Sequence, residues 1–183
     1  PDADLIVVRL KPAKQYLRDF FFLSPGATAF QENDIMAGIR FLTQKALQYQ
    51  KPLVICLGLG SNQGSRSASL PLSFSLRRLG QIQGVTPVVA AGNEAGRAHH
   101  YRGSVSSSDG PVNVEILVPE GSVGFTMELW GQTPQLFSVG FRSPVGESVP
   151  RIPVSLTVET TGSFILEETR IFVKYEAVTS GGQ

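Results

Sequence analysis

A polar amide follows directly after a run of small apolar residues at positions 87–96, PVVAAGNEAG. Residues 88–91 are typical of a buried strand, and Gly92, Asn93 and Glu94 end the apolar run abruptly. One explanation is that the chain only turns here. The other is that a ligand approaches the backbone closely at the glycine, and that the Asn93 side chain donates a hydrogen bond to it.

A second glycine-rich stretch, VICLGLGSNQG, follows another apolar segment, and Gly58, Gly60 and Gly64 are spaced so that the loop could cradle a phosphate. A dinucleotide site also needs an acidic residue about twenty residues later, and no Asp or Glu occurs between positions 34 and 94. The glycines could instead only turn the chain. They could also form, with Leu59, an exposed edge on which an extended peptide pairs through backbone hydrogen bonds. The residues alone leave these three interpretations open.

The other reactive side chains favour structural roles. Cys56 lies in the middle of an apolar run with no base near it, which predicts a core position. His99 and His100 are adjacent and lack a carboxylate or cysteine at ligand spacing, so they are expected in a turn or an interface. Three consecutive phenylalanines occupy positions 20–22, and we expect them in the core or in an apolar interface patch. We therefore expect no metal and no cofactor.

Composition excludes several classes of protein. The chain has 183 residues, 42% of them hydrophobic and 17% charged, which suffices for one good domain or two small ones. A net charge of +1 gives no general attraction to nucleic acid. A single cysteine excludes an internal disulfide framework, and no apolar run approaches the roughly 20 residues that span a membrane. The first residues lack the features of a signal peptide and an initiating Met, so we expect a piece of a longer protein, with no compartment predicted.

The first hundred residues alternate between strand and helix patterns. The pattern predicts strands at 4–10, 52–60 and 85–92, a helix at 31–50, and a second helix beginning near Pro71. The apolar positions that recur at helical spacing are Ile35, Ile39, Leu42 and Ala46, then Leu72, Leu76 and Leu79. This alternation predicts a parallel sheet with right-handed crossovers, in which ligands bind at the carboxyl ends of the strands. Both glycine-rich stretches fall there.

The pattern changes to period two after roughly His100. Strands are predicted at 112–118, 122–130, 136–144, 151–159 and 170–178, separated by Gly and Pro clusters. Such spacing is typical of an antiparallel sandwich or barrel. The sequence thus predicts an α/β domain over residues 1–102 and an all-β domain over 103–183.

The segment VVAAGNEAG resembles the oxyanion-hole segment AAGNEG of the subtilisin-like serine proteases, the subtilases, with Gly96 displaced by one position by Ala95. PDADLIVVRL resembles the strand that follows the catalytic-histidine helix of that family, and VICLGLGSNQGS resembles its VINMSLGG strand. GNEAGRAHHYRG and LKPAKQYLRDFFF are similar to the germination-type (Csp-like) subgroup, in which a jelly-roll domain is inserted between the oxyanion asparagine and the catalytic serine. The resemblance implies part of a subtilisin-like parallel sheet with helices on both faces. A jelly-roll β-sandwich, incomplete at its C-terminus, would follow.

The resemblance also implies roles for individual residues. Asn93 would donate a hydrogen bond to the oxyanion, and Gly58, Leu59 and Gly60 would pair with the backbone of a peptide or protein substrate. Ala91 and Gly92 would be small because the substrate side chain before the scissile bond passes over them. No metal, nucleic acid or membrane span is implied.

The motifs H-G-T-H and G-T-S-x-A do not occur in the sequence, so we expect a fragment without the catalytic triad, inactive alone. Its truncated sheet edges would favour self-association. One alternative is a fragment of a catalytically dead subtilase that binds a partner or signals germination. A weaker alternative is a nucleotide-binding α/β domain.

Overall fold

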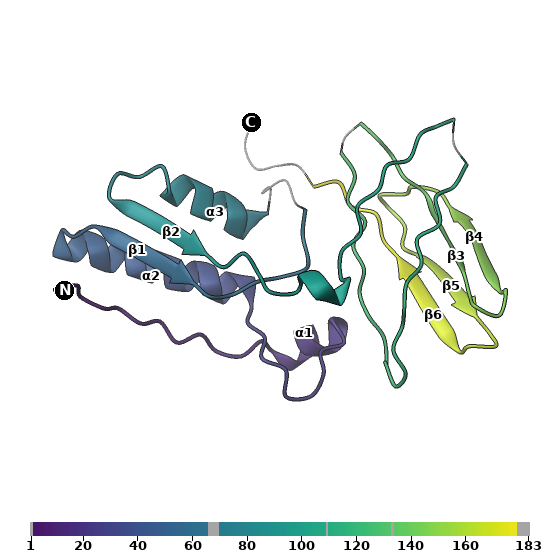
Figure 1. Ribbon diagram of the computed structural model, residues 1–183, viewed down its shortest axis with the longest axis horizontal. Coiled ribbons are helices and arrows are strands. Elements are labelled where there is room, and N and C mark those ends of the chain that lie inside the picture. The colour runs from purple at the N-terminus through teal and green to yellow at the C-terminus, as the bar shows by residue number, and fades with distance from the viewer. Residues whose placement is uncertain (1, 66–69, 109, 133, 179–183) are drawn as a thin grey trace. The chain divides into compact units, whose positions relative to one another are not determined.

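The computed structural model describes residues 2–65, 70–108, 110–132 and 134–178 as a mixed α/β chain with few helices and three two-stranded sheets (Figure 1). By its internal contacts the chain divides into two compact units, Pro1–Glu128 and Leu129–Gln183. The domain boundary that we expect between residues 102 and 103 marks a change in sequence period and stays a prediction. None of the described helices is both long and apolar enough to cross a membrane.

The first unit contains the three α-helices α1 (Gln15–Phe20), α2 (Glu32–Tyr49) and α3 (Pro71–Leu79), and the short 3-10 helix η1 (Ala95–Arg97). The predictions for 31–50 and for a helix starting at Pro71 are confirmed. The Glu32 carboxylate in the first turn of α2 accepts a hydrogen bond from the backbone N–H of Leu72 at 2.9 Å, near the start of α3. Residues 66–69, part of the predicted loop before α3, lie outside the described residues.

The sheet of the first unit consists of β1 (Leu53–Leu57) and β2 (Val85–Val89), which pair in parallel as predicted. Ile55, in the middle of β1, is only 1% exposed. Helix α2 contacts β1, α3 contacts β2, and the two helices contact each other. The described helices therefore cover one face of this sheet, whereas the family resemblance implies helices on both faces.

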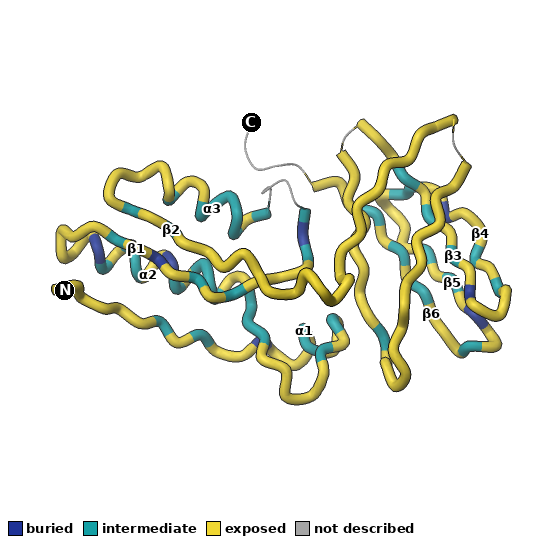
Figure 2. The backbone as a smooth tube through the Cα atoms, in the orientation of Figure 1, coloured by how far each residue is buried: buried dark blue, intermediate teal, exposed yellow. Residues whose placement is uncertain are grey.

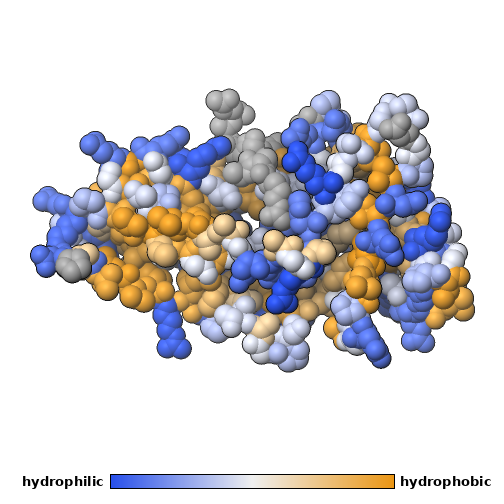
Figure 3. All heavy atoms as spheres, in the orientation of Figure 1, coloured by the Kyte–Doolittle hydropathy of each residue, from blue (hydrophilic) through white to orange (hydrophobic). Residues whose placement is uncertain are grey.

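The other face of the sheet is open (Figure 2). Val54 and Val88 are 69% and 49% exposed, and Cys56, the register partner of Val88, is exposed as well. The expected core position of Cys56 is therefore wrong, because α2 and α3 pack only against the side of the sheet that carries Ile55. Hydrophobic side chains gather over the part of the first unit where β1 and β2 lie (Figure 3).

The predicted strand at 4–10 does not form, because this segment joins no hydrogen-bonded ladder with β1 or with any other described strand. Half-buried Val8 lies instead against Gly38 of α2, where an added Cβ would stand 3.1 Å from the Val8 side chain. An ion pair joins Asp4 to Lys51. The phenylalanine triplet is partly exposed, with Phe20 at 64% and Phe22 at 44%.

The second unit contains two antiparallel pairs, β3 (Val139–Arg142) with β4 (Ser148–Ile152) and β5 (Thr160–Phe164) with β6 (Thr169–Val173). The predicted change to antiparallel structure is confirmed here. Ile152 and Phe164 are its buried apolar side chains. Residues 112–118 and 122–130, predicted as strands, form none, because alternation creates a strand only where a second strand completes the ladder.

Candidate functional site

The carboxyl ends of β1 and β2 meet at one edge of the sheet of the first unit. Leu57 is the register partner of Val89, and the backbone N–H of Ala90 donates to the Leu57 carbonyl at 3.0 Å. Residues 58–60 continue β1 and residues 91–93 continue β2 beyond this pairing. The structure thus brings both sets of predicted site residues to the same edge.

Asn93 is exposed, and no hydrogen bond of its side chain is found to any other described residue. Gly92 before it has a φ of +93°, a conformation that L side chains rarely adopt, and no atom lies within 4 Å of the position of an added Cβ. Ala91 is exposed too. The glycine is therefore required by the turn itself, and the turn leaves the Asn93 amide in contact with solvent.

Gly58 and Gly60 are both exposed, and an added Cβ at either would meet no atom within 4 Å. Leu59 between them is half-buried. No packing contact within the described chain thus demands glycine at 58 or 60. Their small size leaves open space beside the backbone.

The loop after Gly60 is held at its far end by two hydrogen bonds. The Gln63 side-chain amide donates to the Thr126 hydroxyl at 3.4 Å, and the backbone N–H of Gly64 donates to a Glu128 carboxylate oxygen at 2.6 Å. Gly64 itself is buried with a φ of +94°. The loop of residues 58–65 is therefore anchored at both ends, by β1 and by the segment that carries Thr126 and Glu128.

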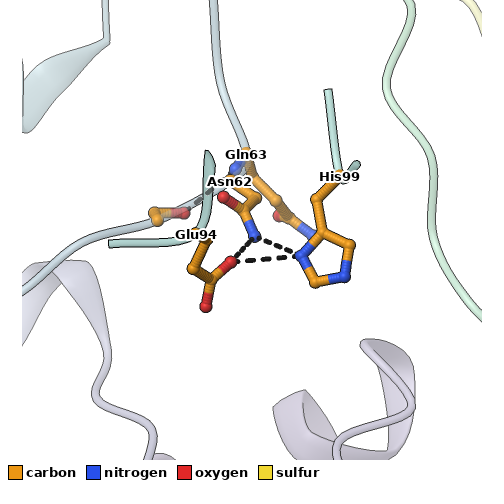
Figure 4. Close-up of polar contacts among 5 residues, drawn as sticks. Asn62, Gln63, Glu94 and His99 are labelled. Atoms are coloured by element: carbon orange, nitrogen blue, oxygen red, sulfur yellow. Dashed lines mark hydrogen bonds and ion pairs between the residues drawn. The ribbon is translucent and has the colours of Figure 1, made fainter. Parts of the chain in front are cut away.

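A cluster of Asn62, Glu94 and His99 joins this loop to the one after β2 (Figure 4). The Asn62 Nδ2 donates to Glu94 Oε2 at 2.6 Å, and His99 Nδ1 lies 3.1 Å from the same oxygen. Asn62 Nδ2 and His99 Nδ1 are 3.2 Å apart. Figure 4 shows the Asn62 amide pointing towards the other two side chains.

Comparison with protein-family models, curated proteins and solved structures finds nothing that matches this chain.

The pKa of Glu94 lies below its ordinary value, chiefly because of the hydrogen bond from Asn62 and then the one from His99. The nearby positive charge of Arg97 acts in the same direction. Glu94 is therefore a carboxylate at neutral pH and an acceptor for both neighbours.

The sequence pattern does not indicate this cluster. The pattern favours a turn or interface position for His99 over metal binding, and it predicts no role for the side chains of Asn62 and Glu94. One signal could have found them: both follow the glycines that end neighbouring parallel strands, and such segments share one sheet edge. Among the described residues, no three His, Cys, Asp or Glu side chains are grouped so that they could hold a metal ion.

The glycine-rich loop is a poor fit to phosphate. The backbone N–H of Gly64 already donates to the Glu128 carboxylate, whose negative charge would repel an anionic ligand. Helix α3 begins only at Pro71, so its N-terminus does not directly follow the glycines. The geometry therefore weighs against nucleotide binding.

Proposed function

We propose that this chain forms part of the substrate cleft of a subtilisin-like serine endopeptidase. One observation carries the proposal: the parallel pairing of β1 and β2 sets exposed Asn93 at the same edge as the open backbone of residues 58–60. The resemblance of the segments around these residues to the subtilases supplies the reaction, which is peptide-bond hydrolysis by acyl transfer.

Acyl transfer needs a nucleophile, a base, an orienting carboxylate and donors for the developing oxyanion. The Asn93 side chain supplies one oxyanion donor, and the backbone N–H of the nucleophile supplies the other. An amide that is not engaged by its own chain can turn towards the charge that develops on the substrate carbonyl. The exposed Asn93 side chain meets this requirement.

The substrate is an extended peptide that pairs as an added strand with residues 58–60. Gly58 and Gly60 leave the approach of a second backbone unobstructed. Ala91 and Gly92 give room to the substrate side chain before the scissile bond. The cleft therefore combines a backbone-pairing wall and an oxyanion donor.

The catalytic triad belongs to other parts of a longer protein in this proposal, because the sequence contains neither H-G-T-H nor G-T-S-x-A. The chain alone is inactive. Residues 103–183 correspond to the jelly-roll insertion of the germination-type subgroup, and the antiparallel pairs β3–β4 and β5–β6 are compatible with part of it.

A second candidate is a catalytically dead subtilase that binds peptides without cleaving them. The open glycine edge favours it equally, since strand pairing needs no triad.

Treating the full-length protein with a fluorophosphonate probe and with fluorogenic peptides separates the two candidates. The protease hypothesis predicts a labelled serine and peptide hydrolysis. Peptide binding without labelling or hydrolysis would support the second candidate, the catalytically inactive peptide-binding subtilase. Absence of labelling, hydrolysis and peptide binding would rule out both.

A further inference from the structure

The carboxylate of Glu94 connects the two loops that carry the candidate cleft. Asn62 lies two residues after Gly60, and Glu94 directly follows Asn93. Asn62 and Glu94 are 32 positions apart in the sequence, so their hydrogen bond joins two loops that are distant along the chain. Glu94 and Asn93 share a peptide bond, so the contact lies directly next to Asn93.

The geometry limits the hydrogen positions in this cluster. A carboxylate oxygen only accepts, and the Asn62 Nδ2 only donates. His99 Nδ1 lies 3.1 Å from Glu94 Oε2 and 3.2 Å from Asn62 Nδ2, so its role depends on which ring nitrogen carries the hydrogen. The clasp proposed below requires that hydrogen on Nδ1, where it donates to the carboxylate. In the other neutral tautomer, two acceptors would face each other at this distance. With the hydrogen on Nδ1, Oε2 receives two donors, one from each side.

We infer that Asn62, Glu94 and His99 form a clasp that positions Asn93 relative to residues 58–60. The role rests on the proposed function, and all three are positioning residues that do not touch the substrate. The clasp is held by charge-assisted hydrogen bonds, because Glu94 is ionised. Arg97 of η1 is the further charged group that acts on this carboxylate.

The clasp can open, since His99 and Glu94 side chains are 53% and 45% exposed and water can replace either donor. Its occupancy therefore depends on the charge of Glu94 and on the donors at positions 62 and 99.

NMR of the isotope-labelled chain tests the clasp without any catalytic readout. Long-range proton–nitrogen spectra, recorded where the imidazole is neutral, should find His99 with its hydrogen on Nδ1. The side-chain amide protons of Asn62 should exchange with water about fivefold more slowly than those of exposed Asn113. Glu94→Ala should abolish that difference.

A reversed pair provides the decisive control. Asn62→Asp sets two carboxylates against each other and should increase the motion of the Asn93 backbone amide in 15N relaxation. Adding Glu94→Gln to Asn62→Asp places the amide donor at position 94 and the carboxylate acceptor at position 62. The motion of the Asn93 amide should then return to the wild-type level. Asn113→Asp and Glu115→Gln, at exposed positions outside both loops, should change neither quantity.

A His99 hydrogen on Nε2, or Asn93 motion that the reversed pair does not restore, would overturn the clasp. These results leave the proposed function untouched, because they concern only the contact between the loops. Conversely, NMR signatures of the clasp together with a full-length protein that neither cleaves nor binds peptides would retain the clasp and remove its role in a protease cleft.

Discussion

The carbonyl oxygen of Leu57 accepts a hydrogen bond from the backbone N–H of Ala90 at 3.0 Å, where β1 and β2 end together. This bond is the last link between the strands before the chain opens into two loops. Because the strands are parallel, both loops leave the sheet at the same edge. The relationship places Asn93 and residues 58–60 in loops that leave the same edge of the sheet, and the proposed cleft depends on it.

Replacing Gly60 tests the pairing of a peptide with the loop after β1. An added Cβ at Gly60 meets no atom within 4 Å, so Gly60→Val should leave the chain folded while its side chain obstructs a partner backbone. We expect the affinity of the full-length protein for a fluorescein-labelled extended peptide to fall at least about tenfold in fluorescence anisotropy. Gly110→Val is the matched control, at an exposed glycine with equally open surroundings outside both loops. Unchanged peptide affinity in Gly60→Val would exclude pairing at this edge.

Gly64→Ala should destabilise the first unit. The residue has a φ of +94°, and an added Cβ would collide with the Leu70 side chain. The backbone conformation alone costs roughly 1–2 kcal/mol for a residue other than glycine. Urea unfolding should show this loss in Gly64→Ala and none of that size in Gly96→Ala, whose added methyl group meets no neighbour. Equal stabilities of Gly64→Ala and Gly96→Ala would mean that residue 64 does not have this backbone conformation or this contact with Leu70.

Acid should open the clasp. The pKa of Glu94 is lowered in the folded chain, chiefly by the hydrogen bonds from Asn62 and His99. Because this pKa is lowered, the ionised Glu94 side chain stabilises the folded chain. This stabilisation is fully present above the ordinary glutamate pKa, about 4.3, and is lost as the pH falls through the lowered pKa. The slow water exchange of the Asn62 amide should therefore persist at pH 5 to 7 and disappear in more acidic solution. Loss of protection on raising the pH within this range would contradict the assignment.

Cys56 should react with thiol reagents in the folded chain, since it lies on the uncovered face of the sheet. Mass spectrometry after brief treatment with iodoacetamide should find one added group per chain without denaturant. Labelling that appears only after unfolding would mean that the face is covered. Comparison of labelling at low and high protein concentration would reveal whether a second copy covers it, as the predicted self-association implies.

The elements with a strong internal period were predictable from the sequence. Helix α2 follows from the spacing of Ile35, Ile39, Leu42 and Ala46, and Pro71 marks the start of α3. The apolar run that contains Ile55 predicts β1. These signals are local, because each is set by residues of one helix or strand.

What the sequence could not show depends on partners elsewhere in the chain. The run around Cys56 looks apolar on both faces, yet which face is covered depends on where α2 and α3 pack. Residues 4–10 and 112–118 have strand patterns, but a strand also needs a paired edge. The contact of Asn62 with His99 spans 37 positions and has no local signature.

The central claim is tested most directly by the steady-state kinetics of full-length protein carrying Asn93→Ala. Removing one oxyanion donor costs about 10²–10³ in kcat, a range known for subtilisin itself, and KM should change little because the interaction is made in the transition state. Asn113→Ala, at an exposed asparagine outside both loops, should retain the wild-type kcat. A kcat for Asn93→Ala equal to that of Asn113→Ala would contradict the assignment of Asn93 to the oxyanion hole.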